Sequence, residues 1–104
     1  METVIQQGEK GAQHHQTLSL QVRYIASRKK YEEPKASKDE TLAALKPKVL
    51  VFFGLHEGPV DGGTKAYFFA HDGVVQTDPS LTLGKLAEGK EELKLDLIER
   101  FEQG

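Results

Sequence analysis

The chain has 104 residues, of which 38% are apolar and 29% are charged, and its formal net charge is −2. This length makes one domain, and the composition is typical of a globular chain. Without a basic excess the chain has no electrostatic footprint for nucleic acid or for an anionic membrane. No apolar run approaches the roughly 18 residues of a membrane span, and residues 1–7 lack the features of a secretory signal. Cysteine is absent, which excludes disulfides and thiolate sites and fits a reducing compartment, so we predict a cytoplasmic domain. We expect a monomer.

The first part of the chain predicts a flexible arm followed by a strand hairpin. Residues 1–16 are polar and aperiodic, so we expect a mobile N-terminal arm there. Ser27–Lys30 is a polar turn, and Tyr31–Lys35 can return as a short strand with Pro34 at its edge or its end. The strand before the turn is marked by apolar residues at every second position, namely Leu18, Leu20, Val22 and Tyr24.

A helix is predicted next. Either Ser37 or Asp39 can cap its first N–H groups, and Glu40 stands three residues after Ser37, as in a capping box. Gly54 is a suitable C-terminal stop, whereas Pro47 removes a backbone donor within the helix. The alternative is a buried strand over residues 49–53, because that run is β-branched and aromatic. The helical spacing is carried by Leu42, Leu45, Val49, Phe52 and Phe53.

The second half of the chain predicts further strands. Glycines and a proline make His56–Thr64 a loop, and Tyr67–Ala70 is a strong strand signal. His71-Asp72-Gly73 is a tight turn before a short partner strand at residues 74–76. An irregular stretch from Asp78 to Gly89 follows, with apolar anchors at Leu81, Leu83 and Leu86. A last strand is indicated by the alternation of Leu93, Leu95 and Leu97, and residues 99–104 are a polar tail.

This order of elements predicts an α+β fold, in which one main helix packs across a mixed sheet of four to five strands. We expect the strongly apolar first and last strands to pair in parallel at the centre of the sheet, where burial is greatest.

Several segments resemble ubiquitin. Thr41–Leu55 matches the ubiquitin helix without a gap, including lysines at positions 46 and 48 and glycine at 54. Tyr67–Ala70 resembles the ubiquitin strand Leu-Ile-Phe-Ala, and Thr82-Leu83 followed by residues 90–95 resembles its C-terminal third. The resemblance implies a ubiquitin-like β-grasp domain over residues 17–98, between a flexible arm at 1–16 and a flexible tail at 99–104. The divergence from ubiquitin and the inserted loop favour a prokaryotic ubiquitin-like family.

The same resemblance implies a conjugation tail at Gln103 and Gly104. In ubiquitin-type modifiers a terminal glycine threads a narrow channel of an activating enzyme, and its carboxylate is joined to target proteins. Gln103 stands where the family usually has a second glycine, and Gly104 is alternatively just the place where the chain stops. The remaining hypotheses are a docking domain that is not conjugated and a sulfur carrier of the same fold.

The resemblance also implies a docking surface on the sheet. With Tyr67 and Phe69 in the core, Phe68 points outward, and Ile98 has the same outward phase on the last strand, beside Lys94 and Asp96. An exposed aromatic residue with polar neighbours is typical of a docking hot spot, although Asp96 interrupts the apolar patch. The alternative is that Phe68 covers a loop or the N-terminal segment.

No pattern in the chain predicts catalysis, a metal site or a cofactor. His14 and His15 are adjacent, and His56 and His71 lie in separate loops, so none has the spacing of a ligand set. Asp61–Thr64 is glycine-rich but lacks the strand, helix and lysine of a phosphate loop. No nucleophile stands beside a base, so we predict a protein that is not an enzyme and whose partners are proteins.

Overall fold

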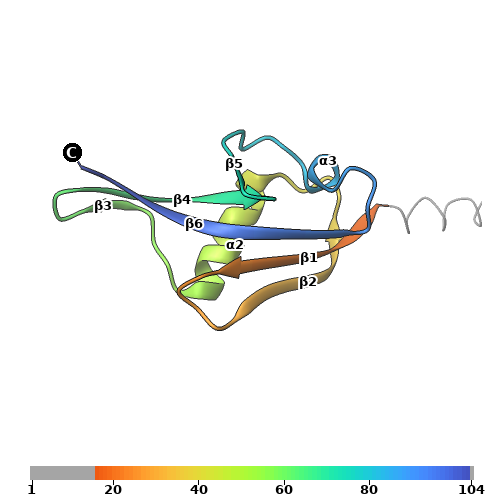
Figure 1. Ribbon diagram of the computed structural model, residues 1–104, viewed down its shortest axis with the longest axis horizontal. Coiled ribbons are helices and arrows are strands. Elements are labelled where there is room, and N and C mark those ends of the chain that lie inside the picture. The colour runs from red at the N-terminus through yellow and green to blue at the C-terminus, as the bar shows by residue number, and fades with distance from the viewer. Residues whose placement is uncertain (1–15, 104) are drawn as a thin grey trace, which may run out of the picture.

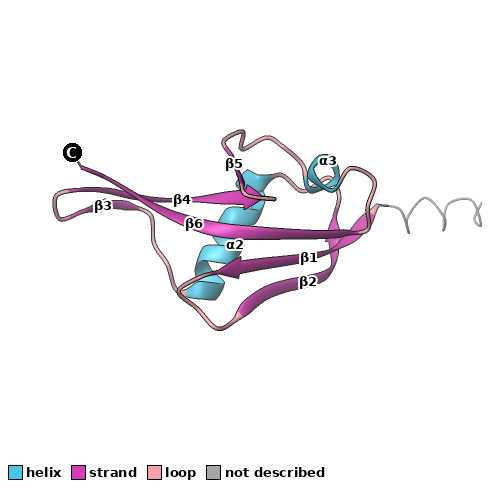
Figure 2. Cartoon of the chain, in the orientation of Figure 1, coloured by secondary structure: helices cyan, strands magenta, loops and turns pink. Residues whose placement is uncertain are grey.

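The computed structural model describes residues 16–103 and shows a mixed sheet with one main helix across it (Figures 1 and 2). Labels follow Figure 1. The helices are α2 (Leu42–Phe53) and α3 (Leu83–Ala87). The strands are β1 (Thr17–Tyr24), β2 (Lys30–Ser37), β3 (Gly58–Val60), β4 (Gly63–His71), β5 (Val74–Gln76) and β6 (Glu92–Gln103). The predicted α+β class is confirmed.

The sheet has the strand order β2-β1-β6-β4-β3, and β5 pairs with β4. β1 and β6 are parallel neighbours at its centre, with Val22 opposite Leu95, as their apolar alternation predicts. Every other pairing is antiparallel. The predicted N-terminal arm lies outside the described residues except for Gln16.

One face of the sheet packs on α2 and α3 and forms the core. Each fully buried leucine there contributes about 1.5–3 kcal/mol relative to an exposed one. The core is built from alternate residues of the central strands and from one stripe of α2, and its least exposed large members are Leu18, Leu20, Val22, Leu45, Val49, Tyr67, Leu83, Leu93 and Leu95.

Pro34 is accommodated because β2 is an edge strand. The pairing of β2 with β1 shifts between Leu18 and Leu20, which face Ala36 and Glu33, so β2 carries one extra residue there. Proline cannot donate to a ladder and is tolerated at such a bulge. β2 is also longer than the predicted segment of residues 31–35, since it runs to Ser37.

The start of α2 differs from the prediction. Thr41, and not Ser37 or Asp39, is the N-cap, because its side-chain oxygen accepts the N–H of Ala44 at 3.1 Å. Ser37 is the last residue of β2, and its hydroxyl oxygen accepts the N–H of Asp39 instead.

The predicted helix is confirmed over the alternative of a strand at residues 49–53. It continues through Pro47, which lies exposed on its surface, where water can bond the carbonyl that lost its donor. Gly54 ends the helix in the left-handed conformation, with a φ of 71°.

Two segments predicted to be irregular are strands instead. The predicted loop at 56–64 contains β3 and the start of β4, joined by a two-residue turn at Asp61-Gly62. The predicted flexible tail from Glu99 is also wrong over residues 99–103, because β6 continues to Gln103 and pairs with β4 up to Gly63. We call β3, residues 63–66 of β4 and residues 99–103 of β6 the three-stranded extension, which reaches past α2 in Figure 1.

Glycine is required at position 63 for this pairing. A Cβ atom there would overlap the carbonyl oxygen of Glu102 and would lie 2.8 Å from the ring of Phe101. The close approach of β4 and β6 therefore depends on the missing side chain. The predicted turn at Asp72-Gly73 is present, with positive φ angles of 51° and 81°, as a two-residue hairpin requires.

Candidate functional site

The face of the sheet opposite α2 carries the four residues predicted to form a docking surface. Their neighbours in sequence, Leu93, Leu95 and Leu97, are buried in the core, so the alternate residues of β6 point to the outer face. Phe68 of β4 stands directly opposite Ile98 of β6, and their side chains are cross-strand neighbours. Lys94 is exposed and Asp96 is half-buried on the same face.

Phe68 is half-buried between two cations. The Nζ of Lys46 lies 5.4 Å from the centre of its ring, and the guanidinium carbon of Arg100 lies 5.2 Å from it. Both distances are within the range of a cation–π interaction, which holds the ring in place. Lys46 is also paired with Glu57 at 3.1 Å, so Arg100 is the cation beside the ring that contributes positive charge to the docking face.

Asp96 interrupts the apolar surface but does not leave it negatively charged. Arg23 is its neighbour on β1, and a guanidinium nitrogen of Arg23 lies 3.2 Å from the Asp96 carboxylate. Both side chains are about half exposed, so this ion pair stabilises the fold by no more than about 1 kcal/mol. Its effect is on the surface, where it neutralises the carboxylate.

The structure adds Ile25, which the sequence interpretation missed. This side chain is 99% exposed at the turn between β1 and β2. It borders a hollow of about 820 Å³ between that turn and residues 96–99 of β6, so Ile25 and Ile98 lie along the same hollow. An isoleucine that continues a strand into a turn of Ala26, Ser27 and Arg28 was the available signal. We call Ile25, Phe68 and Ile98, with Arg23, Lys94, Asp96 and Arg100, the docking face.

On the opposite face of β6, Glu99 joins two tyrosines. The Tyr24 hydroxyl donates to its carboxylate at 3.0 Å, and that of Tyr67, which is buried, donates at 3.2 Å. Burial raises the pKa of Tyr24 and of Tyr67, and the Glu99 carboxylate raises both further. These bonds hold β6 against the core just beyond the end of its pairing with β1.

A second tyrosine cluster links β2 to α2. The Tyr31 hydroxyl donates to Glu33 at 2.6 Å, and Lys48 lies 3.2 Å from Glu33 and 2.7 Å from Glu40. Burial and then the Glu33 carboxylate raise the pKa of Tyr31 to about 12. The Tyr31 hydrogen bond in turn lowers the pKa of Glu33, with Lys48 adding to the shift. This cluster stabilises the fold and lies away from the docking face.

A tyrosine titration tests both clusters. The chain has three tyrosines, all with a raised pKa, and no tryptophan to obscure tyrosinate absorbance. A tyrosine in the unfolded chain has a pKa of about 10, so above that pH the unfolded chain loses protons that the folded chain keeps. Stability is thus fully present below pH ~10 and is expected to fall as the pH rises toward the pKa of Tyr31, about 12. Identical absorbance midpoints for native and urea-unfolded protein would contradict this expectation.

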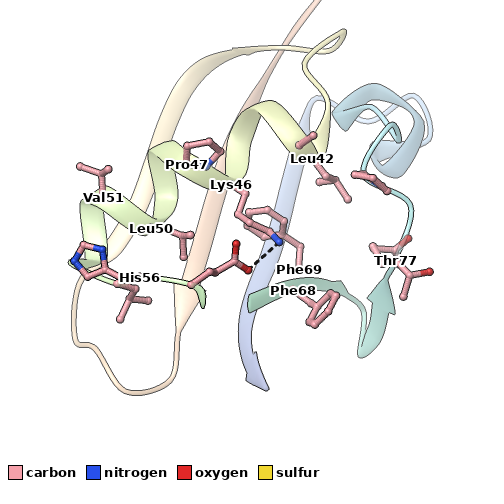
Figure 3. Close-up of a pocket in the computed structure, with 14 residues that line it drawn as sticks. Leu42, Lys46, Pro47, Leu50, Val51, His56, Phe68, Phe69 and Thr77 are labelled. Atoms are coloured by element: carbon pink, nitrogen blue, oxygen red, sulfur yellow. Dashed lines mark hydrogen bonds and ion pairs between the residues drawn. The ribbon is translucent and has the colours of Figure 1, made fainter. Parts of the chain in front are cut away.

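A further hollow of about 670 Å³ lies between α2 and the edge of β4, lined by Leu42, Pro47, Leu50, Val51, Leu55 and neighbouring residues (Figure 3). β3 pairs with β4 up to Lys65 and β5 begins to pair at Phe69, which leaves a short open edge. Glu57 closes part of that edge, because its carboxylate accepts the N–H of Tyr67 at 2.8 Å and binds Lys46 at 3.1 Å. Phe68 also lines this hollow, so its ring lies where the hollow meets the docking face. The docking face is the better candidate because it includes Ile25, which is 99% exposed.

The histidines were the residues considered for a metal site or for catalysis. Among residues 16–103, His, Asp and Glu form no group of three that could hold a metal ion. His56 and His71 lie in separate segments, and the pair at positions 14 and 15 lies outside the described residues. In the described part of the chain, neither helix is long and apolar enough to cross a membrane.

Comparison with known proteins rests on the structure. No family model matches the sequence, and no curated protein matches it. Ubiquitin from Caldiarchaeum subterraneum superposes with a TM-score of 0.59 over 85% of this chain and 99% of its own, at 17% identity. The ubiquitin-like domain of yeast Ddi1 gives 0.58 over 86% and 95%, at 12% identity. A structure described as "Molecular Mimicry of SUMO promotes DNA repair" gives 0.58 over 82% and 94%, at 15% identity.

The chain has a ubiquitin-like β-grasp fold. This confirms the resemblance read from the ubiquitin-like segments of the sequence. Identities of 12–17% establish the fold alone, so the role of the ubiquitin-like domain has to be argued from its own surface.

Proposed function

We propose that this ubiquitin-like domain is a non-enzymatic docking module that binds other proteins through its docking face. The observation that carries the proposal is Ile25, an isoleucine that is 99% exposed along the same hollow as Ile98. Exposed apolar side chains with a polar rim are typical of interaction sites. Phe68, held between Lys46 and Arg100, supplies the aromatic anchor that such sites favour.

The charges around the face favour an acidic partner surface. Arg28 and Lys29 are exposed in the turn beside Ile25, Lys30 is exposed at the start of β2, and Lys94 is exposed on β6. Asp96 is already paired with Arg23, so the uncompensated charge of this surface is positive. Complementary charge speeds encounter and selects partners more than it adds affinity. We therefore propose cytoplasmic partners that present aliphatic side chains flanked by aspartate and glutamate.

Site-specific photo-crosslinking in the host cell tests the docking module. A photoreactive amino acid at position 94 lies on the docking face without replacing an anchor, and the same group at exposed position 35 of β2 is the matched control. We expect heavier, light-dependent bands from position 94 and not from position 35. Ile25→Asp and Phe68→Ala should each remove most of that signal, because loss of an anchor weakens binding by about tenfold or more.

Equal bands from both positions, or bands that survive both anchor substitutions, would overturn the proposed docking face. Circular dichroism of each variant confirms that the fold is retained. Phe68→Ala removes a half-buried ring and its two cation contacts, whereas Ile25→Asp changes a fully exposed side chain, so the second variant reports on binding with little effect on stability.

Covalent modification through Gly104 is a second candidate. It is supported by the three-stranded extension, which carries Gln103 to the far end of the molecule from α3 (Figure 1). The pairing of Gln103 with Gly63 would have to open before a tail could enter an activating enzyme. Samples kept in the dark, run on the same denaturing blot for the full chain and for a Gly104 deletion, distinguish conjugation from docking. Heavier bands that resist reductant and vanish when Gly104 is deleted would establish conjugation. Free protein in both lanes would leave docking alone.

A further inference from the structure

β6 has an unpaired edge along the three-stranded extension. Its pairing with β1 ends where Tyr24 faces Leu97, whereas its pairing with β4 continues on the other side to Gln103. Within residues 16–103, no strand covers the remaining edge of Ile98–Gln103. Figure 1 shows this part of β6 extending beyond the end of β1. An exposed strand edge presents backbone N–H and C=O groups that can pair with another strand.

The position that β1 leaves is open for such a strand. Where β1 turns away after Tyr24, the hollow of about 820 Å³ lies between the turn and residues 96–99 of β6. A strand added to this edge would lie on the same side of β6 as β1, in line with it, and would end at this hollow. The exposed residues Arg28, Lys29 and Lys30 border it, so the end of the added strand would meet positive charge.

The charge pattern of β6 is complementary to itself in one register. Residues that stand opposite each other in an antiparallel pair lie on the same face of the sheet. In a symmetric pair of identical strands, one residue must therefore stand opposite its own copy, and the two-fold axis lies between these two residues. An axis at Glu99, Arg100 or Glu102 would place that charge against its own copy, which is destabilising. An axis at Ile98 would require an edge that β1 occupies, and one at Gln103 would overlap too little of the described strand.

An axis at Phe101 has none of these defects. It places Arg100 of each copy opposite Glu102 of the other, which makes two ion pairs on the outer face. On the inner face it places the two Phe101 residues opposite each other, each 45% exposed in the single chain, with Glu99 opposite Gln103. Cross-strand aromatic pairs and opposite charges both stabilise a ladder.

We propose that two copies of this chain associate through residues 98–103 of β6, antiparallel and in the register centred on Phe101. The two sheets then become continuous across the axis. A ladder of this length buries less surface than a permanent dimer, so the association is reversible and depends on concentration. This inference departs from the expected monomer, and it does not depend on the docking face having a partner.

Charge reversal combined with mixing tests the register. Arg100→Glu alone places a new glutamate opposite Glu102 in both pairs, and Glu102→Arg alone places a new arginine opposite Arg100 in both pairs. We expect each to weaken dimerisation by about tenfold or more in sedimentation velocity across a concentration series of the full chain. The mixture of the two single variants should dimerise again, and so should the double variant R100E/E102R, because both restore opposite charges.

Lys35→Glu is the matched control, since it reverses an exposed charge on β2, away from β6. Circular dichroism verifies that every variant is folded. A wild-type chain that stays monomeric at every concentration would overturn the proposal. Dimerisation that survives both single charge reversals, or that mixing fails to restore, would overturn it as well and would assign self-association to another surface.

Discussion

Replacement of Leu95 by aspartate is expected to abolish folding. Leu95 is 1% exposed on the central strand β6, opposite Val22 of β1, so its side chain lies in the middle of the core. A carboxylate there would have no partner, and its burial would cost several kcal/mol against a total stability of about 5–15 kcal/mol. Far-ultraviolet circular dichroism and urea unfolding of the purified variant would measure the loss.

Lys94→Asp is the matched control for this prediction. It introduces the same side chain one residue earlier on the same strand, but on the exposed outer face. We expect its free energy of unfolding to stay within about 1 kcal/mol of the wild-type value. A folded Leu95→Asp variant with a cooperative urea transition near the wild-type midpoint would show that the assigned phase of β6 is wrong.

Glu99→Ala is expected to have the second largest effect, lowering the free energy of unfolding by about 1–3 kcal/mol. The buried Tyr67 hydroxyl and the Tyr24 hydroxyl both donate to the Glu99 carboxylate, and alanine would remove this shared acceptor. Urea unfolding measures the change. Glu102→Ala, on the exposed end of the same strand, should change the stability by less than about 0.5 kcal/mol.

A double-mutant cycle assigns this effect to the hydrogen bonds. In a Tyr67→Phe background one of the two donors is already gone, so Glu99→Ala should cost less than it does in the wild type. Glu99→Gln keeps an acceptor without the charge, so it should restore part of the stability and bring the tyrosine pKa values closer to their ordinary range. Equal effects of Glu99→Ala and Glu102→Ala would exclude the tyrosine network as the cause.

The core could be predicted from the sequence because burial leaves a periodic record. Leu18, Leu20 and Val22 alternate with polar residues, and the structure buries all three. Leu42, Leu45 and Val49 recur at helical spacing, and they too are buried. Pro47 and the β-branched run after it argued for a strand locally, but packing of this stripe on the sheet outweighs those preferences.

The cap of α2 illustrates a different limit. Ser37, Asp39 and Thr41 all carry oxygens that can accept an N–H group, and the sequence pattern alone favoured the first two. The structure chooses Thr41 because β2 keeps residues up to Ser37 in the sheet, which delays the start of the helix. The boundary is therefore set by strand pairing that is distant in sequence from the helix itself.

The sequence by itself determined the α+β class, the order of the main strands and the helix, the resemblance to ubiquitin and the outward phase of Phe68, Lys94, Asp96 and Ile98. The resemblance rests on matched residues in three segments. The other features follow from alternation between water and a core, which is recorded in side-chain polarity. Only the tertiary structure decided that residues 99–103 are a strand, that Phe68 lies between two cations and that Ile25 lies along the same hollow as Ile98. A strand that is exposed on both faces has no alternation of polar and apolar residues, and what holds it is backbone pairing to a distant segment. Contacts between long side chains form only after the strands that carry them have paired.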